Sequence, residues 1–173
     1  MNDIVIFGST GFIGRSIYNY LINEGYNVKG FSSETCNLLY PSELKKVLSI
    51  IKNDFNLIIC SSITPSVDDS LDSMLKNIQM IDNIVKEVPI ERLKAIIYFS
   101  SIDIYGFVDD LDNINEETPQ RFVGYYGLSK LASEHILRKN FGVIPITILR
   151  LPGIYGYGDN YKSTIGKFIK DSL

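Results

Sequence analysis

Short apolar runs alternate with amphipathic segments along this chain. The run Ile4–Phe7 is continuously apolar and ends at Gly8, which is typical of a strand buried on both faces of a sheet. The next segment, Phe12–Glu24, spaces its apolar residues three and four apart and stops at Gly25, so we expect a helix there. The chain therefore opens as a strand, a tight turn and a helix.

The same alternation continues to the end of the sequence. The patterns predict further strands over Asn27–Phe31, Phe55–Cys60, Ala95–Phe99 and Pro145–Leu149. They predict further helices over Pro41–Ile51, Asp68–Glu87, Tyr126–Phe141 and Ser163–Leu173, and a surface loop over Asp109–Arg121. Helices that alternate with buried strands are typical of a parallel sheet wrapped on both faces. The sequence thus predicts one α/β domain, residues 1–173, with a doubly wound parallel sheet.

Composition and charge narrow the class of protein. The 173 residues are 45% hydrophobic, which suffices for a single core of ordinary size. The net charge of −3 provides no positive field for a nucleic acid or an anionic membrane. No run of 18 apolar residues occurs, and the N-terminus lacks the basic flank of a secretion signal. We therefore expect a cytoplasmic protein with no nucleic-acid or membrane partner.

The cysteines favour neither a metal site nor a disulfide framework. Cys36 and Cys60 lie far apart without a Cys-x-x-Cys spacing, and the chain has a single histidine. Unpaired cysteines fit a reducing compartment, and we expect no bound metal.

The first turn has the residues that a dinucleotide needs. Three glycines form a G-x-x-G-x-x-G pattern directly after a strand and at the start of a helix. A backbone without side chains lets a pyrophosphate approach the helix N-terminus, where N–H groups and the helix dipole favour an anion. Three glycines alone also fit a turn that binds nothing, but the flanking strand and helix favour binding. We expect the coenzyme to contact Gly8, Thr10, Gly11, Phe12, Ile13 and Gly14.

The end of the second strand leaves the choice of coenzyme open. An acidic residue often holds the adenosine ribose of NAD at this place, whereas this chain has Ser32 and no arginine close by. Both NAD and NADP therefore remain candidates, with Ser32 as a contact. Asn37 and Leu38 would offer the adenine an amide and an apolar wall, although Asn37 could equally bond its own backbone.

Three residues in the second half of the chain form a candidate acid–base set. Ser101 follows the fourth predicted strand, and Tyr126 and Lys130 lie four residues apart on one face of the next helix. An ammonium near a phenol favours the phenolate, so we expect Lys130 to lower the pKa of Tyr126 toward neutral pH. Ser101 would hydrogen-bond the same substrate oxygen. Each residue alone is common surface decoration, and only the combination with the glycine turn favours catalysis.

Together these motifs resemble the extended short-chain dehydrogenase/reductase family. Gly8–Gly14 is similar to the family's cofactor turn, Phe99–Gly106 to its Ser-Ser-x-x-Val-Tyr-Gly stretch, and Tyr126–Lys130 to its Tyr-x-x-x-Lys motif. Leu149–Gly156 is similar to the segment that follows the family's fifth strand. The resemblance covers nearly the whole chain and implies a Rossmann domain that binds NAD or NADP.

The resemblance also implies further coenzyme contacts. Small residues follow the third strand in the family, and this chain has Cys60, Ser61 and Ser62 there. Asn77 falls where the family has a helix asparagine with a structural and proton-relay role, and Pro152 lies in the segment after the fifth strand. Arg150, at a strand end, is expected to be an anchoring hydrogen-bond donor.

The family's substrates are mostly nucleotide sugars. The resemblance therefore implies a nucleotide-sugar substrate for this chain. Dehydratases of the family place an aspartate directly after the serine or threonine, whereas this chain has Ile102 there and Asp103 next. We therefore expect an epimerase or ketoreductase rather than a dehydratase. Family members often dimerise through the helices that follow the third and fourth strands, so a homodimer is expected.

The family's C-terminal lobe, which holds the nucleotide sugar, is largely absent from this chain. The 173 residues would then be either the N-terminal part of a longer enzyme, the interpretation we favour, or a naturally short protein. A function from a different class remains open: a non-catalytic NAD(P)-binding sensor or partner subunit that kept the fold without the substrate lobe.

Overall fold

The chain forms a five-stranded parallel sheet with the strand order β2-β1-β3-β4-β5. The computed structural model describes residues 2–107, 114–121, 124–156, 158, 168, 170 and 171. The strands are β1 (Asp3–Phe7), β2 (Val28–Phe31), β3 (Phe55–Ile59), β4 (Leu93–Ser101) and β5 (Ile146–Leu151). The helices are α1 (Phe12–Asn23), α2 (Pro41–Ser49), α3 (Leu71–Glu87) and α4 (Tyr125–Asn140), with short 3₁₀ turns η1 (Ile90–Arg92) and η2 (Ile102–Tyr105).

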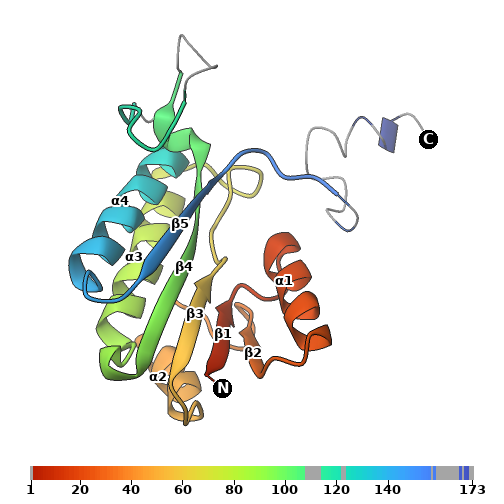
Figure 1. Ribbon diagram of the computed structural model, residues 1–173. Helices are drawn as coiled ribbons and strands as arrows, with labels where there is room; N and C mark the ends of the chain where they lie inside the picture. The colour runs from red at the N-terminus through yellow and green to blue at the C-terminus, as the bar shows by residue number, and fades with distance from the viewer. Residues whose placement is uncertain are drawn as a thin grey trace.

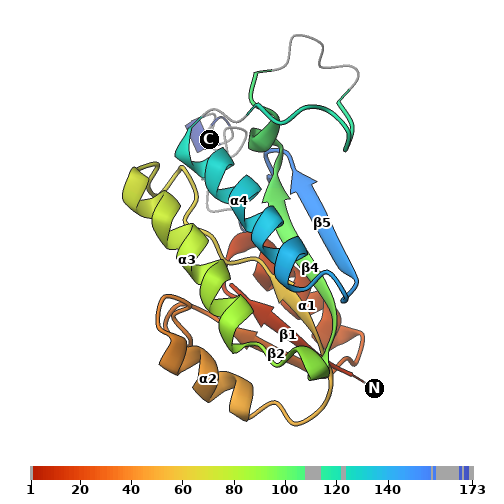
Figure 2. The same cartoon turned by 90° about the vertical axis from the view of Figure 1, so that its left-hand side faces the viewer.

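Helices cover both faces of this sheet, as Figures 1 and 2 show. Helix α1 lies on one face, where its apolar side packs on a cluster built around Ile4, Ile6 and Ile58. Helices α2, α3 and α4 lie on the other face over the larger part of the core. The predicted doubly wound parallel sheet is thereby confirmed.

The strand order places a crevice at one edge of the sheet. From β1 the chain builds outward to β2 on one side and to β3, β4 and β5 on the other. The connections after β1 and β3 therefore leave in opposite directions. This leaves a crevice between the carboxyl ends of β1 and β3. Ligands bind at such a switch point in open α/β sheets.

The observed elements differ from the predicted ones mainly at their ends. Helix α3 begins at Leu71 rather than Asp68 because Ser70 caps it: Ser73 N donates to Ser70 Oγ at 3.2 Å, and Ser70 N donates to Ser73 Oγ at 3.1 Å. Strand β4 extends past Ala95–Phe99 at both ends because it pairs with β3 and β5 along its length. Most of the predicted helix over 163–173, and residues 109–113 of the predicted loop, lie outside the described residues.

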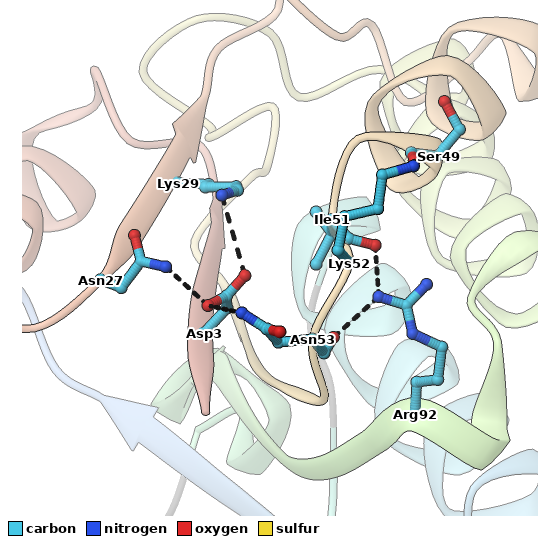
Figure 3. Close-up of polar contacts among 8 residues, drawn as sticks. All are labelled: Asp3, Asn27, Lys29, Ser49, Ile51, Lys52, Asn53 and Arg92. Carbon is cyan, nitrogen blue, oxygen red and sulfur yellow. Dashed lines mark hydrogen bonds and ion pairs between the residues drawn. The ribbon is translucent and has the colours of Figure 1, made fainter. Parts of the chain in front are cut away.

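A polar cluster fastens the opposite, amino-terminal edge of the sheet (Figure 3). Asp3 is 1% exposed, and its Oδ1 accepts hydrogen bonds from the amides of Asn27 at 2.6 Å and Asn53 at 3.2 Å. Lys29 Nζ lies 3.7 Å from Asp3 Oδ2, and Arg92 donates to the Asn53 carbonyl at 2.7 Å. These contacts hold the strand starts together, away from the crevice.

Among the helices of the described part of the chain, none has the length and apolar character needed to cross a bilayer. Both cysteines are present as thiols, with Cys36 buried and Cys60 partly buried. In the same described residues, no three His, Cys, Asp or Glu side chains gather as a metal site would require.

Candidate coenzyme and active site

A cleft of about 770 Å³ opens at the carboxyl edge of the sheet. Its walls come from the turn after β1, the loop after β3, the end of β4 with η2, the first turns of α4 and the segment after β5. The cleft brings together predicted site residues from all five places: Gly8, Gly11, Phe12, Ile13, Gly14, Cys60, Ser62, Ser101, Tyr126, Lys130 and Pro152.

The glycine turn leaves no room for side chains at two positions. Gly8 has a φ of +86°, and a Cβ there would lie 2.8 Å from the backbone nitrogen of Ser61. A Cβ on Gly14 would lie 2.1 Å from the carbonyl oxygen of Gly8. Both distances are shorter than a van der Waals contact. Only glycine therefore lets α1 start this close to the end of β1 and the loop after β3.

The start of α1 fits the anionic part of a dinucleotide. Gly11 is the N-cap residue and provides no side-chain hydrogen bond to the helix, so the first N–H groups are not capped from within. Gly11, Phe12 and Ile13 all line the cleft. Backbone N–H groups and the positive end of the helix dipole thus face a space that a pyrophosphate can enter.

Lys130 is buried between β4 and the start of α4. Its side chain is 4% exposed, and Nζ donates to the carbonyl oxygen of Phe99 at 2.8 Å. Nζ also lies 5.0 Å from the ring centroid of Tyr98 and 5.5 Å from that of Tyr126, so the predicted neighbourhood of Tyr126 and Lys130 is confirmed. Burial lowers the pKa of Lys130 to about 8, although the nearby Cys60 and Glu134 raise it.

The predicted direction of the Tyr126 pKa is wrong for this arrangement. Burial raises the pKa of Tyr126 above its ordinary value, the Ser62 hydroxyl beside it lowers it, and the negative charge of Asp103 raises it further. The expected effect of Lys130 is missing because burial lowers the pKa of its amine to about 8, so the amine is already neutral at the pH where the phenol titrates.

Ser101 sits where β4 passes into η2. The side chain is 8% exposed, and its Oγ accepts a hydrogen bond from the Asp103 amide at 3.2 Å, which caps η2. Helix α4 packs tightly on this turn, since a Cβ on Gly127 would lie 2.7 Å from the Asp103 carbonyl oxygen. The close packing of Gly127 brings the Tyr126 end of α4 against the Ser101 end of β4.

Several predicted coenzyme contacts lie outside the lining of this cleft. They are Thr10, Ser32, Asn37, Leu38, Ser61 and Asn77. Asn37 uses Oδ1 to accept from the Leu39 amide at 3.0 Å, which is the backbone-bonding alternative considered for this residue. Leu38 is 4% exposed within the core, and Ser32 bonds to Thr35.

Asn77 fixes the loop that follows β3. Its Oδ1 accepts from the Ile63 amide at 2.8 Å, and its Nδ2 donates to the Ile63 carbonyl at 2.9 Å. Nδ2 also lies 3.4 Å from Ser129 Oγ on α4. Asn77 therefore joins the Ser62 loop to the helix of Tyr126.

The cleft also has lining residues that the sequence analysis did not single out as contacts. They lie at strand ends or after them: Thr64, Pro65, Ser66, Phe99, Ser100, Ile102, Asp103, Leu151, Gly153 and Ile154. Position was the available signal, because every loop that leaves the carboxyl edge of a parallel sheet can border the ligand.

Comparison with known proteins points to the same protein family as the motifs do. Residues 4–173 match the model of the NAD dependent epimerase/dehydratase family. The GDP-6-deoxy-D-talose 4-dehydrogenase of Aggregatibacter actinomycetemcomitans is 26% identical over 96% of this chain and 58% of its own length. The decarboxylating sterol-4-alpha-carboxylate 3-dehydrogenase of Dictyostelium discoideum is 25% identical over 92% of this chain and 56% of its own length. The chain thus spans little more than half the length of these curated relatives.

A solved structure supports the fold. The dTDP-4-dehydrorhamnose reductase of Bacillus anthracis, in complex with NADP, superposes with a TM-score of 0.82 at 20% identity. The superposition covers 98% of this chain and 59% of that protein. The fold with its glycine turn and the family match over residues 4–173 agree, and we conclude that the chain belongs to the NAD-dependent epimerase/dehydratase family.

Proposed function

We propose that this chain is the coenzyme-binding part of an NAD(P)-dependent nucleotide-sugar epimerase or ketoreductase that uses Ser101, Tyr126 and Lys130. One observation carries the proposal: these three residues line the same cleft as the glycine turn. A site that only bound a dinucleotide would have no use for a phenol, an amine and a hydroxyl gathered beside the coenzyme.

The three side chains have separate roles in this proposal. A nicotinamide coenzyme held on the glycine turn would supply the hydride acceptor and donor. Tyr126 exchanges a proton with the substrate oxygen, giving it in ketone reduction and taking it in the oxidative half of an epimerisation. The Ser101 hydroxyl orients the same oxygen and stabilises negative charge on it.

Lys130 governs the protonation of this set. Because burial raises the pKa of Tyr126, the phenol holds its proton at neutral pH, which suits the proton-donor role. For the base role the pKa of Tyr126 must fall. The ammonium of Lys130, 5.5 Å from the ring centroid, can lower it by moving from the Phe99 carbonyl toward the phenol oxygen.

A nucleotide sugar is the proposed substrate class. The GDP-6-deoxy-D-talose 4-dehydrogenase relative supports a sugar substrate, since its name describes the oxidation of a sugar carbinol, which gives a ketone. Ile102, which lines the cleft directly after Ser101, speaks against dehydration because an apolar side chain cannot protonate a leaving hydroxyl. The lobe that would hold the sugar would belong to a longer protein.

The test has two stages. First, the chain is titrated with NADH and NADPH by fluorescence, and coenzyme binding is checked as a rise in melting temperature. Second, turnover of a panel of UDP-, GDP- and dTDP-sugars is measured in the longer protein that includes the sugar-binding lobe, as the wild type, Tyr126→Phe and the control Tyr125→Phe, whose tyrosine is 44% exposed on the same helix. Turnover that Tyr126→Phe alone abolishes supports the proposal.

Two other outcomes contradict it. Tight coenzyme binding without turnover, unchanged by Tyr126→Phe, favours a non-catalytic dinucleotide-binding module. A chain whose melting temperature neither coenzyme shifts has no coenzyme site, and the proposal then fails at its first step.

A further inference from the structure

A buried ion pair lies directly behind the proposed acid–base set. Glu134 of α4 accepts from Arg150 of β5 through both carboxylate oxygens, with Nε to Oε1 at 3.1 Å and Nη2 to Oε2 at 2.8 Å. The two side chains are only 3% and 9% exposed. The expectation that Arg150 is an anchoring donor is confirmed, whereas its partner Glu134 was not predicted. Bidentate pairs of this kind fix direction as well as distance.

The Glu134–Arg150 pair accepts or donates hydrogen bonds on both sides of Ser101. Ser100 Oγ donates to Glu134 Oε1 at 2.5 Å, and Ser100 is the residue before Ser101. Arg150 Nη1 donates to the hydroxyl of Tyr105 at 2.8 Å, and Tyr105 ends the short turn that begins after Ser101. The segment that presents Ser101 to the cleft is therefore held at both of its ends by the ion pair.

The same pair also ties this segment to the helix of Lys130. Glu134 follows Lys130 by one turn of α4, so both side chains face the sheet. Lys130 bonds to the Phe99 carbonyl and Glu134 bonds to the Ser100 hydroxyl, which are consecutive residues of β4. Helix α4 is thus fastened to the last residues of β4 at two adjacent points.

Stability alone is a poor explanation for such a pair. Two charges taken out of water lose hydration that their mutual attraction only roughly repays, and neutral side chains of similar size often replace a buried pair without loss of stability. A bidentate, charge-assisted pair does, however, fix the relative geometry of the groups that it joins. Apart from a bond from Arg150 Nη1 to the Glu116 carbonyl at 3.3 Å, the side-chain bonds of this pair go to β4, η2 and α4, which carry or adjoin Ser101, Tyr126 and Lys130.

We propose that Glu134 and Arg150 are positioning residues, whose ion pair sets the end of β4 with Ser101 against the face of α4 with Lys130. This inference rests on the proposed function, since the geometry that it protects is that of the acid–base set. Glu134 has a second effect: its negative charge raises the pKa of Lys130 against the effect of burial and so keeps more of the amine charged.

The test removes both charges at once. Glu134→Gln with Arg150→Met leaves no unpaired buried charge, so this double variant should fold with nearly wild-type stability. The matched control is Asp3→Asn, which neutralises another buried carboxylate at the opposite edge of the sheet (Figure 3). Two quantities are measured. The first is the dissociation constant of each coenzyme, NADH and NADPH, and the second is the pKa of Lys130, which NMR of its side chain reports.

We expect the double variant to bind coenzyme about tenfold more weakly, while Asp3→Asn binds as the wild type does. The pKa of Lys130 should fall in Glu134→Gln and in the double variant, and stay unchanged in Asp3→Asn. A folded double variant with wild-type affinity and an unchanged Lys130 pKa would overturn the inference. Wild-type protein that binds neither coenzyme would instead refute the proposed function, and the Lys130 pKa would still report on the ion pair.

Should the double variant fail to fold, Arg150→Lys gives a second reading. Lysine keeps the positive charge but cannot bond Glu134 with two nitrogens and Tyr105 with a third. Weaker coenzyme binding in a stable Arg150→Lys variant supports a positioning role. Unchanged binding there shows that charge alone suffices, and the inference is then wrong.

Discussion

The ammonium of Lys130 donates a hydrogen bond to the carbonyl oxygen of Phe99 at 2.8 Å, two residues before the end of β4. The cation of the proposed acid–base set is therefore bound to the strand that presents Ser101. This contact satisfies a buried amine.

The first prediction concerns pH. Burial lowers the pKa of Lys130 from 10.5 to about 8, so the folded chain releases this proton near pH 8 and the unfolded chain near pH 10.5. Between these values the unfolded state binds more protons, and the free energy of unfolding rises with pH. Below pH 8 both states hold the proton, and the cost of burying the charge is fully present.

Urea unfolding between pH 7 and 10 measures this effect. Lys130→Met should lose a slope of at most about 1.4 kcal/mol per pH unit relative to the wild type. Lys46→Met, at an exposed position of α2, should keep the wild-type slope. Parallel curves for wild type and Lys130→Met would show that the amine is not deprotonated on folding.

The second prediction concerns the glycine turn. Alanine at Gly14 would place its Cβ 2.1 Å from the Gly8 carbonyl oxygen, and this clash outweighs the gain of about 1 kcal/mol that alanine brings to a helix. We expect a net loss of about 1–3 kcal/mol in unfolding free energy, together with weaker coenzyme binding. Gly153→Ala is the control for stability because its Cβ would meet nothing within 4 Å. Equal stability of the two variants would contradict the packing seen at Gly14.

The parts of the site that the sequence could predict are those that depend on the spacing of residues along the chain. Gly8 and Gly14 are recognisable because they lie six positions apart where a strand passes into a helix. Tyr126 and Lys130 share a helix face by their spacing alone. These relationships depend on neighbours along the chain, which a pattern of residues records directly.

Contacts between distant elements were not predictable in this way. Arg150 meets Glu134 across 16 residues and Tyr105 across 45, and no local pattern reports such a pairing. The pKa of Tyr126 has the same origin, since its direction depends on burial, on the Ser62 hydroxyl and on the charge of Asp103. Of these residues, only Glu134 could have been predicted to face the sheet, because it lies one helical turn beyond Lys130 on the same helix face.

The third prediction is a homodimer through α3 and α4. These helices lie side by side on one face of the sheet (Figure 2), and α3 exposes Leu71 by 50% and Leu75 by 54%. Covering these two leucines, which lie one helical turn apart, would favour association. We expect a dimer by light scattering, and a monomer for Leu75→Glu with unchanged circular dichroism. Tyr20→Glu, at a position on α1 that is 63% exposed, is the control and should remain dimeric. A wild-type monomer at every concentration contradicts the prediction.

The last prediction concerns how the helix of Tyr126 begins. Its N-cap residue, Gly124, has no side chain to bond the first N–H groups of α4. Asp69, from the segment before α3, supplies that acceptor: its Oδ1 takes a hydrogen bond from the Tyr126 amide at 3.3 Å. A carboxylate at this end of a helix is also favoured by the helix dipole.

Removing this cap should loosen the first turn of α4. Asp69→Ala is expected to cost about 1 kcal/mol in unfolding free energy and to speed hydrogen exchange at the Tyr126 amide. Asp69→Asn, which keeps an acceptor oxygen, should lose less. Asp54→Ala, which breaks an exposed ion pair with Lys94, should leave exchange at Tyr126 unchanged. If Asp69→Ala leaves that exchange rate as it is in the wild type, the helix is held by its own contacts with η2 and β4, and Asp69 does not position Tyr126.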